Sequence, residues 1–273
     1  AQFGGDQYIA GQKEPVIDMP TRFVDFMRVL VPMAGDDTTP EGEQVNIYGN
    51  HVGSWNFAAT AYLNRWKVKI YYEHYFDDHS QMFFQYGRWK DGHIGLEITF
   101  PKNRFIDTFV YEGLGTKDQT GPMLYDSFWG EFEEQISAKD NYYNHYLYQG
   151  WQHWGMGIGN PLLPGPIYNK NGQITFISNR VLAHHIGFCG SPCQSLSYRM
   201  LLSYSRHWGT YDNPLNEIKK QFNSLFEVTY APQQLKGWSF TVSGAMDRGN
   251  LLGNNYGGML VIRKQGIIKS GNK

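Results

Sequence analysis

Residues 142–161 carry the densest group of side chains that could bind a ligand. Trp151 and Trp154 stand among four glycines, and His153 and Asn160 lie close to them in the sequence. Tryptophan faces stack on sugar rings and the indole N–H donates a hydrogen bond, while glycines let the backbone turn tightly and approach a ligand. We expect the two tryptophans to stack on sugars, and His153 and Asn160 to bind hydroxyl groups. The alternative is a loop whose aromatic side chains pack inside the fold.

A second group of candidate ligand-binding residues is cationic. Arginine binds carboxylates through two parallel hydrogen bonds, so a ring of such side chains could receive an acidic polysaccharide. We expect Arg199, Arg206 and His207 to attract uronate or pyruvate carboxylates. The alternative is that the group pairs with carboxylates of this chain and braces the fold. The cationic candidates are Arg180, His184, His185, Arg199, Arg206, His207 and Arg248.

The only two cysteines, Cys189 and Cys193, stand in the sequence Gly-Phe-Cys-Gly-Ser-Pro-Cys. The glycine and proline between them suit a turn, and an oxidising envelope allows disulfides to form. We expect a local disulfide in preference to two free thiols.

Other kinds of chemistry have less support. The glycine-rich segment lacks the Lys-Ser/Thr pair of a phosphate loop, and no Gly-x-Ser-x-Gly nucleophile motif is present. Serines and histidines are numerous enough for Ser–His pairs to arise by chance, and no set of three or four metal ligands stands at workable spacing. We therefore expect no catalysis, no cofactor and no metal.

The elements that must position these residues are strands. Apolar side chains alternate with polar or small ones in many segments of about ten residues, and a strand places such neighbours on opposite faces of a sheet. A short amphipathic helix is also indicated near residues 126–138. We expect strands near residues 22–33, 44–51, 54–64, 66–76, 82–90, 92–101, 104–114, 174–189, 195–208, 221–231, 236–248 and 257–268.

The composition fits one large β domain. The chain has 273 residues, of which 41% are hydrophobic, and this is too long and too apolar for a disordered protein. The aromatic content of 16% suits aromatic girdles at two membrane interfaces or the binding of carbohydrate, and a soluble β-sandwich with an aromatic core is the alternative. The net charge of −1 argues against a nucleic-acid partner.

The chain reads as a single domain over residues 1–273. Short polar turns occur beside long loops near 115–145, 151–173 and 209–220. This asymmetry is typical of outer-membrane barrels, which also close with even strand numbers in single bacterial chains. The sequence therefore predicts an all-β, antiparallel, transmembrane outer-membrane β-barrel with about 12–14 strands in this chain.

Several motifs, taken in their order along the chain, resemble the Wzi-like capsule assembly family. The resemblance extends over about residues 22–266. The motifs are GNHVGSW (49–55), YEHYF (72–76), LEITFPKNR (96–104), GWQHWGMGIGNP (150–161), WGTYDNP (208–214) and DRGNLLGNN (247–255).

The resemblance implies an outer-membrane barrel of about eighteen strands that acts as a lectin for capsular polysaccharide and has no enzymatic activity. Members of the family are considerably longer than this chain. The resemblance therefore places this chain in their C-terminal portion, with the first strands of the barrel absent or carried elsewhere.

The sequence thus predicts an outer-membrane protein of a Gram-negative bacterium that binds capsular or related surface polysaccharide and aids capsule assembly or attachment. Its expected partners are the glycan, outer-membrane lipids and other outer-membrane proteins. The alternative function is that of a porin, or of a structural subunit in a larger outer-membrane complex.

Overall fold

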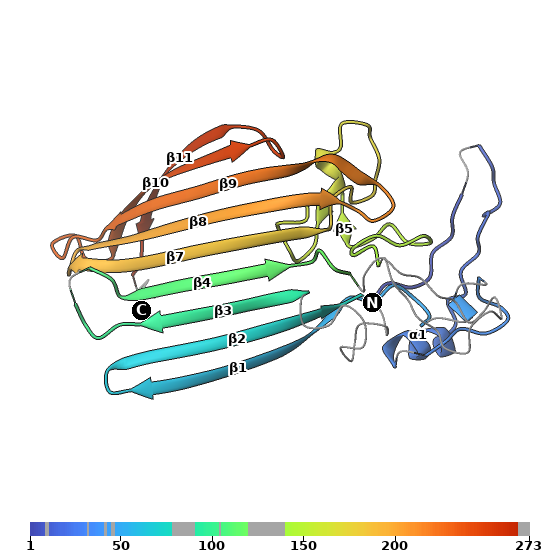
Figure 1. Ribbon diagram of the computed structural model, residues 1–273, viewed down its shortest axis with the longest axis horizontal. Helices are drawn as coiled ribbons and strands as arrows, with labels where there is room; N and C mark the ends of the chain where they lie inside the picture. The colour runs from blue at the N-terminus through green and yellow to red at the C-terminus, as the bar shows by residue number, and fades with distance from the viewer. Residues whose placement is uncertain are drawn as a thin grey trace, which may run out of the picture.

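The computed structural model describes residues 1–8, 11–31, 33–40, 43–44, 47–77, 91–103, 105–119 and 140–266. Nine strands form one antiparallel sheet in the order β1-β2-β3-β4-β7-β8-β9-β10-β11 (Figure 1). A small hairpin, one helix and one 3₁₀ turn lie outside it. The predicted all-β, antiparallel architecture is confirmed.

The helices and strands of the described residues have the following bounds. The strands of the large sheet are β1 (Gly53–Leu63), β2 (Trp66–Phe76), β3 (Gly92–Thr99), β4 (Thr108–Gly115), β7 (Val181–Cys193), β8 (Leu196–Gly209), β9 (Pro214–Tyr230), β10 (Trp238–Gly249) and β11 (Asn255–Lys264). The remaining elements are α1 (Phe23–Leu30), the hairpin of β5 (Gln152–His153) and β6 (Met156–Gly157), and the 3₁₀ turn η2 (Pro166–Tyr168).

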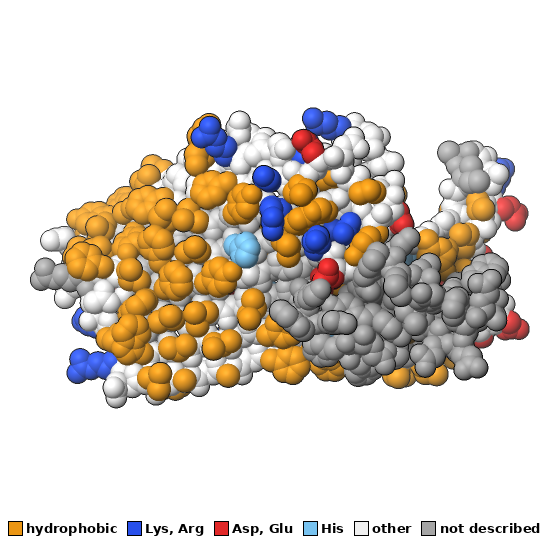
Figure 2. Space-filling model, in the orientation of Figure 1, with side chains coloured by type: hydrophobic (Ala, Val, Ile, Leu, Met, Phe, Trp, Pro, Cys, Tyr) orange, Lys and Arg blue, Asp and Glu red, His pale blue; other side chains and the backbone are white. Residues whose placement is uncertain are grey.

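The large sheet has two unlike faces. Directly paired residues of antiparallel strands lie on the same face, and the register brings the apolar members of all nine strands together. We call this the apolar face, and Figure 2 shows hydrophobic side chains covering it. Its side chains meet solvent: Phe57 on β1 is 55% exposed and Leu260 on β11 is 64% exposed. The face is therefore not part of a buried core within this chain.

The opposite face, here called the polar face, carries hydrogen bonds and ion pairs between neighbouring strands. Arg199 Nη2 on β8 lies 3.4 Å from Glu227 Oε1 on β9, and Ser243 Oγ on β10 donates to Glu227 Oε2 at 3.0 Å. Asn223 Nδ2 on β9 donates to Asp247 Oδ1 on β10 at 2.6 Å. These pairs favour one register, because a slip of one residue would move every polar group to the apolar face.

Within the described residues the sheet is open and does not close into a barrel. β1 pairs only with β2, and β11 pairs only with β10. All ten residues of β11 are exposed. The described strands number eleven, nine of them in this sheet, against the 12–14 that the sequence predicts.

The two ends of the sheet carry connections of unlike length. At one end, residues 64–65 join β1 to β2 and residues 194–195 join β7 to β8. At the other end, here called the loop end, lie α1 and the long connection that contains β5 (Figure 1). The expected asymmetry is present, but the predicted loop at 209–220 is short, since β9 already begins at Pro214.

The largest departure from the predicted strands lies near the N-terminus, where residues 22–33 contain helix α1. The backbone N–H of Arg22 donates to the Asp25 carboxylate at 2.9 Å, which satisfies a free donor of the first turn as in a capping box. Asp25 is fully buried and forms ion pairs with Arg22 and Arg28. Its charge is therefore matched inside the fold, and the apolar residues of α1 remain largely exposed.

Three further predicted elements differ or cannot be compared. In the described part of residues 44–51 there is no strand: residue 44 is helical, and residues 47 and 50 form isolated β-bridges. The predicted strand at 82–90 and the predicted helix at 126–138 lie outside the described residues.

The predicted disulfide is wrong, because Cys189 and Cys193 are both free. Both cysteines belong to β7, where Cys189 pairs with Arg199 and Cys193 with Leu196. Four residues of extended strand separate Cα atoms by roughly 13 Å, and a disulfide needs them within ~7 Å. The glycine and proline therefore belong to an irregular strand end and not to a closed turn.

Two small buried clusters hold the loops at the loop end of the sheet. The first joins the ends of β4 and β7 to the long connection between them, and the second joins the N-terminal region to that connection. Their members are Leu114, Leu163, Phe176, Val181 and Ala183, and Met19, Val29, Tyr48 and Leu147, respectively. None of the helices in the described residues has the length and apolar character needed to cross a membrane.

Candidate functional site

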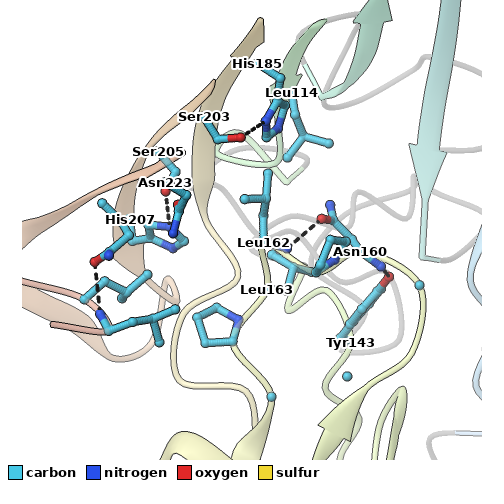
Figure 3. Close-up of a pocket in the computed structure, with 18 of the residues that line it drawn as sticks. Leu114, Tyr143, Asn160, Leu162, Leu163, His185, Ser203, Ser205, His207 and Asn223 are labelled. Atoms are coloured by element: carbon cyan, nitrogen blue, oxygen red, sulfur yellow. Dashed lines mark hydrogen bonds between the residues drawn. The ribbon is translucent and has the colours of Figure 1, made fainter. Parts of the chain in front are cut away.

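A cavity of about 860 Å³ lies between the polar face of the sheet and the loop that follows the β5–β6 hairpin. In Figure 3 the side chains of His185 and Ser203 come from the sheet, and Leu162 and Leu163 come from the loop that faces them. The volume is within the ~300–1,000 Å³ of ligand pockets, and the mixture of apolar walls and a few polar groups is also typical of them. We treat it as the candidate binding site.

The floor of the cavity holds two histidine–serine contacts, one between β7 and β8 and one within β8. His185 Nδ1 on β7 lies 2.6 Å from Ser203 Oγ on β8, and His207 Nε2 lies 3.0 Å from Ser205 Oγ. The other ring nitrogen of His207 faces the hydroxyl of Ser178 at 3.5 Å. His207 is therefore oriented by a hydroxyl where a serine hydrolase would use a carboxylate, and the floor is suited to hydrogen bonding with a ligand.

One wall of the cavity is acidic. His93 on β3 stands between Glu73 on β2 and Glu112 on β4, with Nδ1 3.8 Å from Glu73 Oε2 and Nε2 3.4 Å from Glu112 Oε1. The hydroxyl of Tyr71 donates to Glu112. The alternation of the three strands explains this cluster, because all four side chains belong to the polar face. No group that could hold a metal ion was found among the described residues.

The loop wall is held by hydrogen bonds of its own. The backbone N–H of Asn160 donates to Tyr143 Oη at 3.0 Å, and the backbone N–H of Leu162 donates to Asn160 Oδ1 at 3.0 Å. The Tyr143 ring meets Phe176 edge-on at 5.3 Å between centroids. Gly159 has φ +93°, and a Cβ there would lie 2.8 Å from the Tyr143 hydroxyl, so a larger residue would strain the turn. The loop is thus ordered before any ligand arrives.

Asp91 ties the loops around the cavity together at the end of β3. Its carboxylate accepts from the backbone N–H groups of Asp118 and Gln119 and from the Tyr142 hydroxyl at 3.1 Å. Burial raises the pKa of Asp91 to about 6, because desolvation disfavours the charged form more than these three donors favour it. The carboxyl group therefore changes charge in the mildly acidic range.

The aromatic candidates of residues 142–161 separate into two places. Asn160 lines the cavity, whereas His153 and Trp154 lie at the tip of the β5–β6 hairpin, away from it. Trp154 is 83% exposed and has φ +51°, followed by Gly155 at +80°, as in a two-residue hairpin turn. Trp151 is partly buried, and its indole N–H finds no partner among the described residues. The stacking of sugars on these tryptophans stays a prediction.

The cationic candidates are also dispersed. His184 and Arg206 belong to the apolar face, where His184 Nδ1 lies 2.8 Å from Tyr111 Oη. Arg180 packs 3.8 Å over the Tyr211 ring and donates to a backbone carbonyl. Of the cationic candidates, His185 and His207 line the cavity and the others do not.

Arg199, by contrast, is paired with Glu227. The expected ring of cations is therefore not formed, and for Arg199 the bracing alternative is the one observed.

Several cavity residues were not among the predicted site residues: Glu73, His93, Glu112, Tyr143, Ser203 and Ser205. The alternation of side chains between the two faces of a strand would have indicated most of them. For example, Glu112 pairs with His185 on the polar face of the sheet, whereas His184, the neighbour of His185 on β7, lies on the apolar face. No such signal indicates Tyr143, because side chains in a loop do not alternate between two faces.

Comparison with known proteins gives no counterpart. No protein-family model matches the chain, and neither does any curated protein or any solved structure. The resemblance to the Wzi-like family therefore rests on the motifs alone.

Proposed function

We propose that this chain forms part of the wall of an outer-membrane β-barrel in a Gram-negative bacterium, and that it binds capsular or related surface polysaccharide in the cavity described above. The observation that carries the proposal is the division of one nine-stranded antiparallel sheet into an exposed apolar face and a polar face that bears a ligand-sized cavity.

The apolar face supports the membrane part of the proposal. A monomeric soluble protein rarely exposes an apolar surface that extends over a whole sheet, and lipid tails are a natural occupant of such a face. Alternation of apolar and polar side chains along strands of this length is the pattern of transmembrane barrels. Closure would require further strands that pair with β1 and β11.

Aromatic side chains near both ends of the apolar face add support. Near the short-turn end the Trp66 and Phe100 rings lie 5.0 Å apart, and near the loop end the Trp55 and Phe76 rings lie 6.1 Å apart. An aromatic pair near each end of the first strands is the placement expected where strands cross the two interfaces of a bilayer.

The cavity supports the glycan part of the proposal. Its floor offers hydroxyl, imidazole and amide groups, which suit the many hydroxyls of a saccharide, while Tyr75 and Tyr143 offer aromatic surface. The resemblance to a capsule assembly family points to the same class of ligand. We propose binding without catalysis, and no cofactor.

A pair of tryptophan substitutions on one strand tests the proposal. Ser203→Trp would fill the floor of the cavity, and Ser197→Trp would place the same side chain six residues away on the same face of β8, outside this cavity. We expect the first variant to lose at least tenfold in affinity for capsular polysaccharide extracted from the producing strain, and the second to bind like the natural protein.

Binding would be measured on the folded, detergent-solubilised protein by calorimetry. Loss of binding in both variants while both remain folded, or in neither, would contradict the assignment of the cavity.

A further inference from the structure

The described lining of the cavity contains carboxylates but no permanently cationic side chain. Among the described lining residues there are two glutamates and three histidines, and no lysine or arginine. The carboxylates are those of Glu73 and Glu112, with His93 between them.

The nearby cations of the polar face are engaged elsewhere. Lys67 Nζ lies 3.5 Å from Glu97, and Lys69 Nζ lies over the Tyr71 ring at 5.1 Å from its centroid. Both lysines precede Glu73 on β2 and lie nearer the short-turn end of the sheet. None of the described residues that line the cavity beside the acidic wall is therefore a lysine or an arginine.

The sign of the local charge follows from this lining. Two carboxylates, those of Glu73 and Glu112, flank the one imidazole of His93, so the cluster is net negative whether or not that ring carries a proton. In a partly enclosed site such a field repels carboxylates and attracts ammonium groups.

The rest of the cavity suits the same ligand. Tyr75 and Tyr143 line it together with the acidic wall, and aromatic faces attract cations as well as the apolar faces of sugar rings. Ser203 and Ser205 on the floor supply hydroxyls for the uncharged part of the sugar.

We propose that the cavity selects sugar units that carry a free amine and discriminates against uronic acids. This inference rests on the proposed function, since it concerns the glycan that the same cavity would bind. It also replaces the expectation that Arg199 and Arg206 would draw an acidic polysaccharide into the site, because neither lines the cavity.

Three oligosaccharides of equal length test the selectivity: a chitosan oligomer with free amines, its fully N-acetylated counterpart, and an oligogalacturonate. Affinities would be measured on the full chain by calorimetry at mildly acidic pH, at which the chitosan amines are protonated and carboxylates remain ionised. We expect the chitosan oligomer to bind at least tenfold more tightly than its N-acetylated counterpart, and the uronate to bind most weakly. Equal affinities for the first two, or a preference for the uronate, would overturn the inference.

The variant Glu73→Gln/Glu112→Gln removes both charges and keeps the shape of the wall. We expect the ratio of the chitosan affinity to the N-acetylated affinity to fall about tenfold. The matched control is Glu97→Gln, which removes a carboxylate from the same face outside the cavity and should leave the ratio unchanged. If the double variant does not fold, each single substitution gives the same comparison, and an unchanged ratio contradicts the inference.

The two proposals fail in different ways. If the natural protein binds the extracted polysaccharide but shows no preference for amines, only the selectivity is lost. If the folded protein binds neither that polysaccharide nor any of the oligosaccharides, the proposed function itself is wrong.

Discussion

At the scale of single residues, Asp91 shows how the loops around the cavity depend on one buried carboxyl group. Its side chain is 1% exposed and holds the residues on either side of segment 120–139 through Asp118, Gln119 and Tyr142. The pKa is raised from its ordinary value of 3.8 to about 6 by burial. Protonation therefore favours the folded loops.

We predict that the local stability of these loops decreases as pH rises. Because the folded pKa of Asp91 exceeds that of the unfolded chain, the stabilisation is complete below about pH 4 and is lost as pH rises through about 6, with a total of about 3 kcal/mol. Hydrogen exchange at the amides of Asp118 and Gln119, corrected for the intrinsic rates, would measure this. Asp91→Asn should abolish the slope, since an amide does not titrate in this range.

Asp25 provides an internal control of opposite sign. The side-chain hydrogen bond from Arg22 is the main cause that lowers its pKa. Its contribution is therefore present above the ordinary carboxylate range and is lost as pH falls below it. Amides of α1 should lose protection on acidification, and an equal slope in both regions would contradict the role assigned to Asp91.

At the scale of elements, the strands were predictable because apolar and polar side chains alternate along them and lie on opposite faces of the sheet. The predicted segment 66–76 coincides with β2, and the predicted 54–64 differs from β1 by one residue at each end. Helix α1 was missed because Asp25 is buried while most apolar residues of the helix, Val29 excepted, are exposed, which departs from the usual pattern. The early start of β9 was missed because its first residues are mostly polar and exposed.

The cavity was only partly predictable for a similar reason. Its floor follows from strand parity and register. Its loop wall depends on contacts between residues far apart in sequence, such as the hydrogen bond at 2.8 Å from the Phe176 N–H to Asn144 Oδ1. Composition indicated that residues 142–161 were unusual, but it could not separate Asn160 at the cavity from Trp154 at the hairpin tip.

Two neighbouring residues of β8 test whether the apolar face meets lipid. Leu202 lies on the apolar face opposite Ile186, and Leu201 lies on the polar face opposite Gly187. Arginine at mid-depth of a bilayer costs roughly 2–4 kcal/mol, whereas on the inner side of a barrel it reaches water. We predict that Leu202→Arg loses this amount and that Leu201→Arg loses much less.

Unfolding by denaturant in bilayers of defined composition would give both values. A larger loss for Leu201→Arg than for Leu202→Arg would place lipid on the wrong face and contradict the proposal.

At the scale of the whole molecule, the two faces of the sheet and its two open edges must be explained together. A membrane has no water to satisfy free backbone groups, and each unsatisfied group there costs several kcal/mol, so a sheet that meets lipid must have no free edge. β1 and β11 are the edges of the sheet within the described residues, and β11 is exposed along its whole length. The lipid-facing role of the apolar face therefore requires that both strands gain partners in the assembled protein.

This requirement gives a direct prediction for the protein in its native outer membrane. Every second N–H of a strand points to the same neighbour, so half of the β11 amides point away from β10. We predict that these amides exchange as slowly as those of β8, which is paired on both sides. Hydrogen exchange followed by mass spectrometry on isolated outer membranes would measure both strands in one sample.

Exchange in β11 that is fast at alternate positions, beside slow exchange in β8, would mean that the sheet remains open in the membrane. An open edge is not compatible with lipid, and the apolar face would then need a protein partner in place of a bilayer.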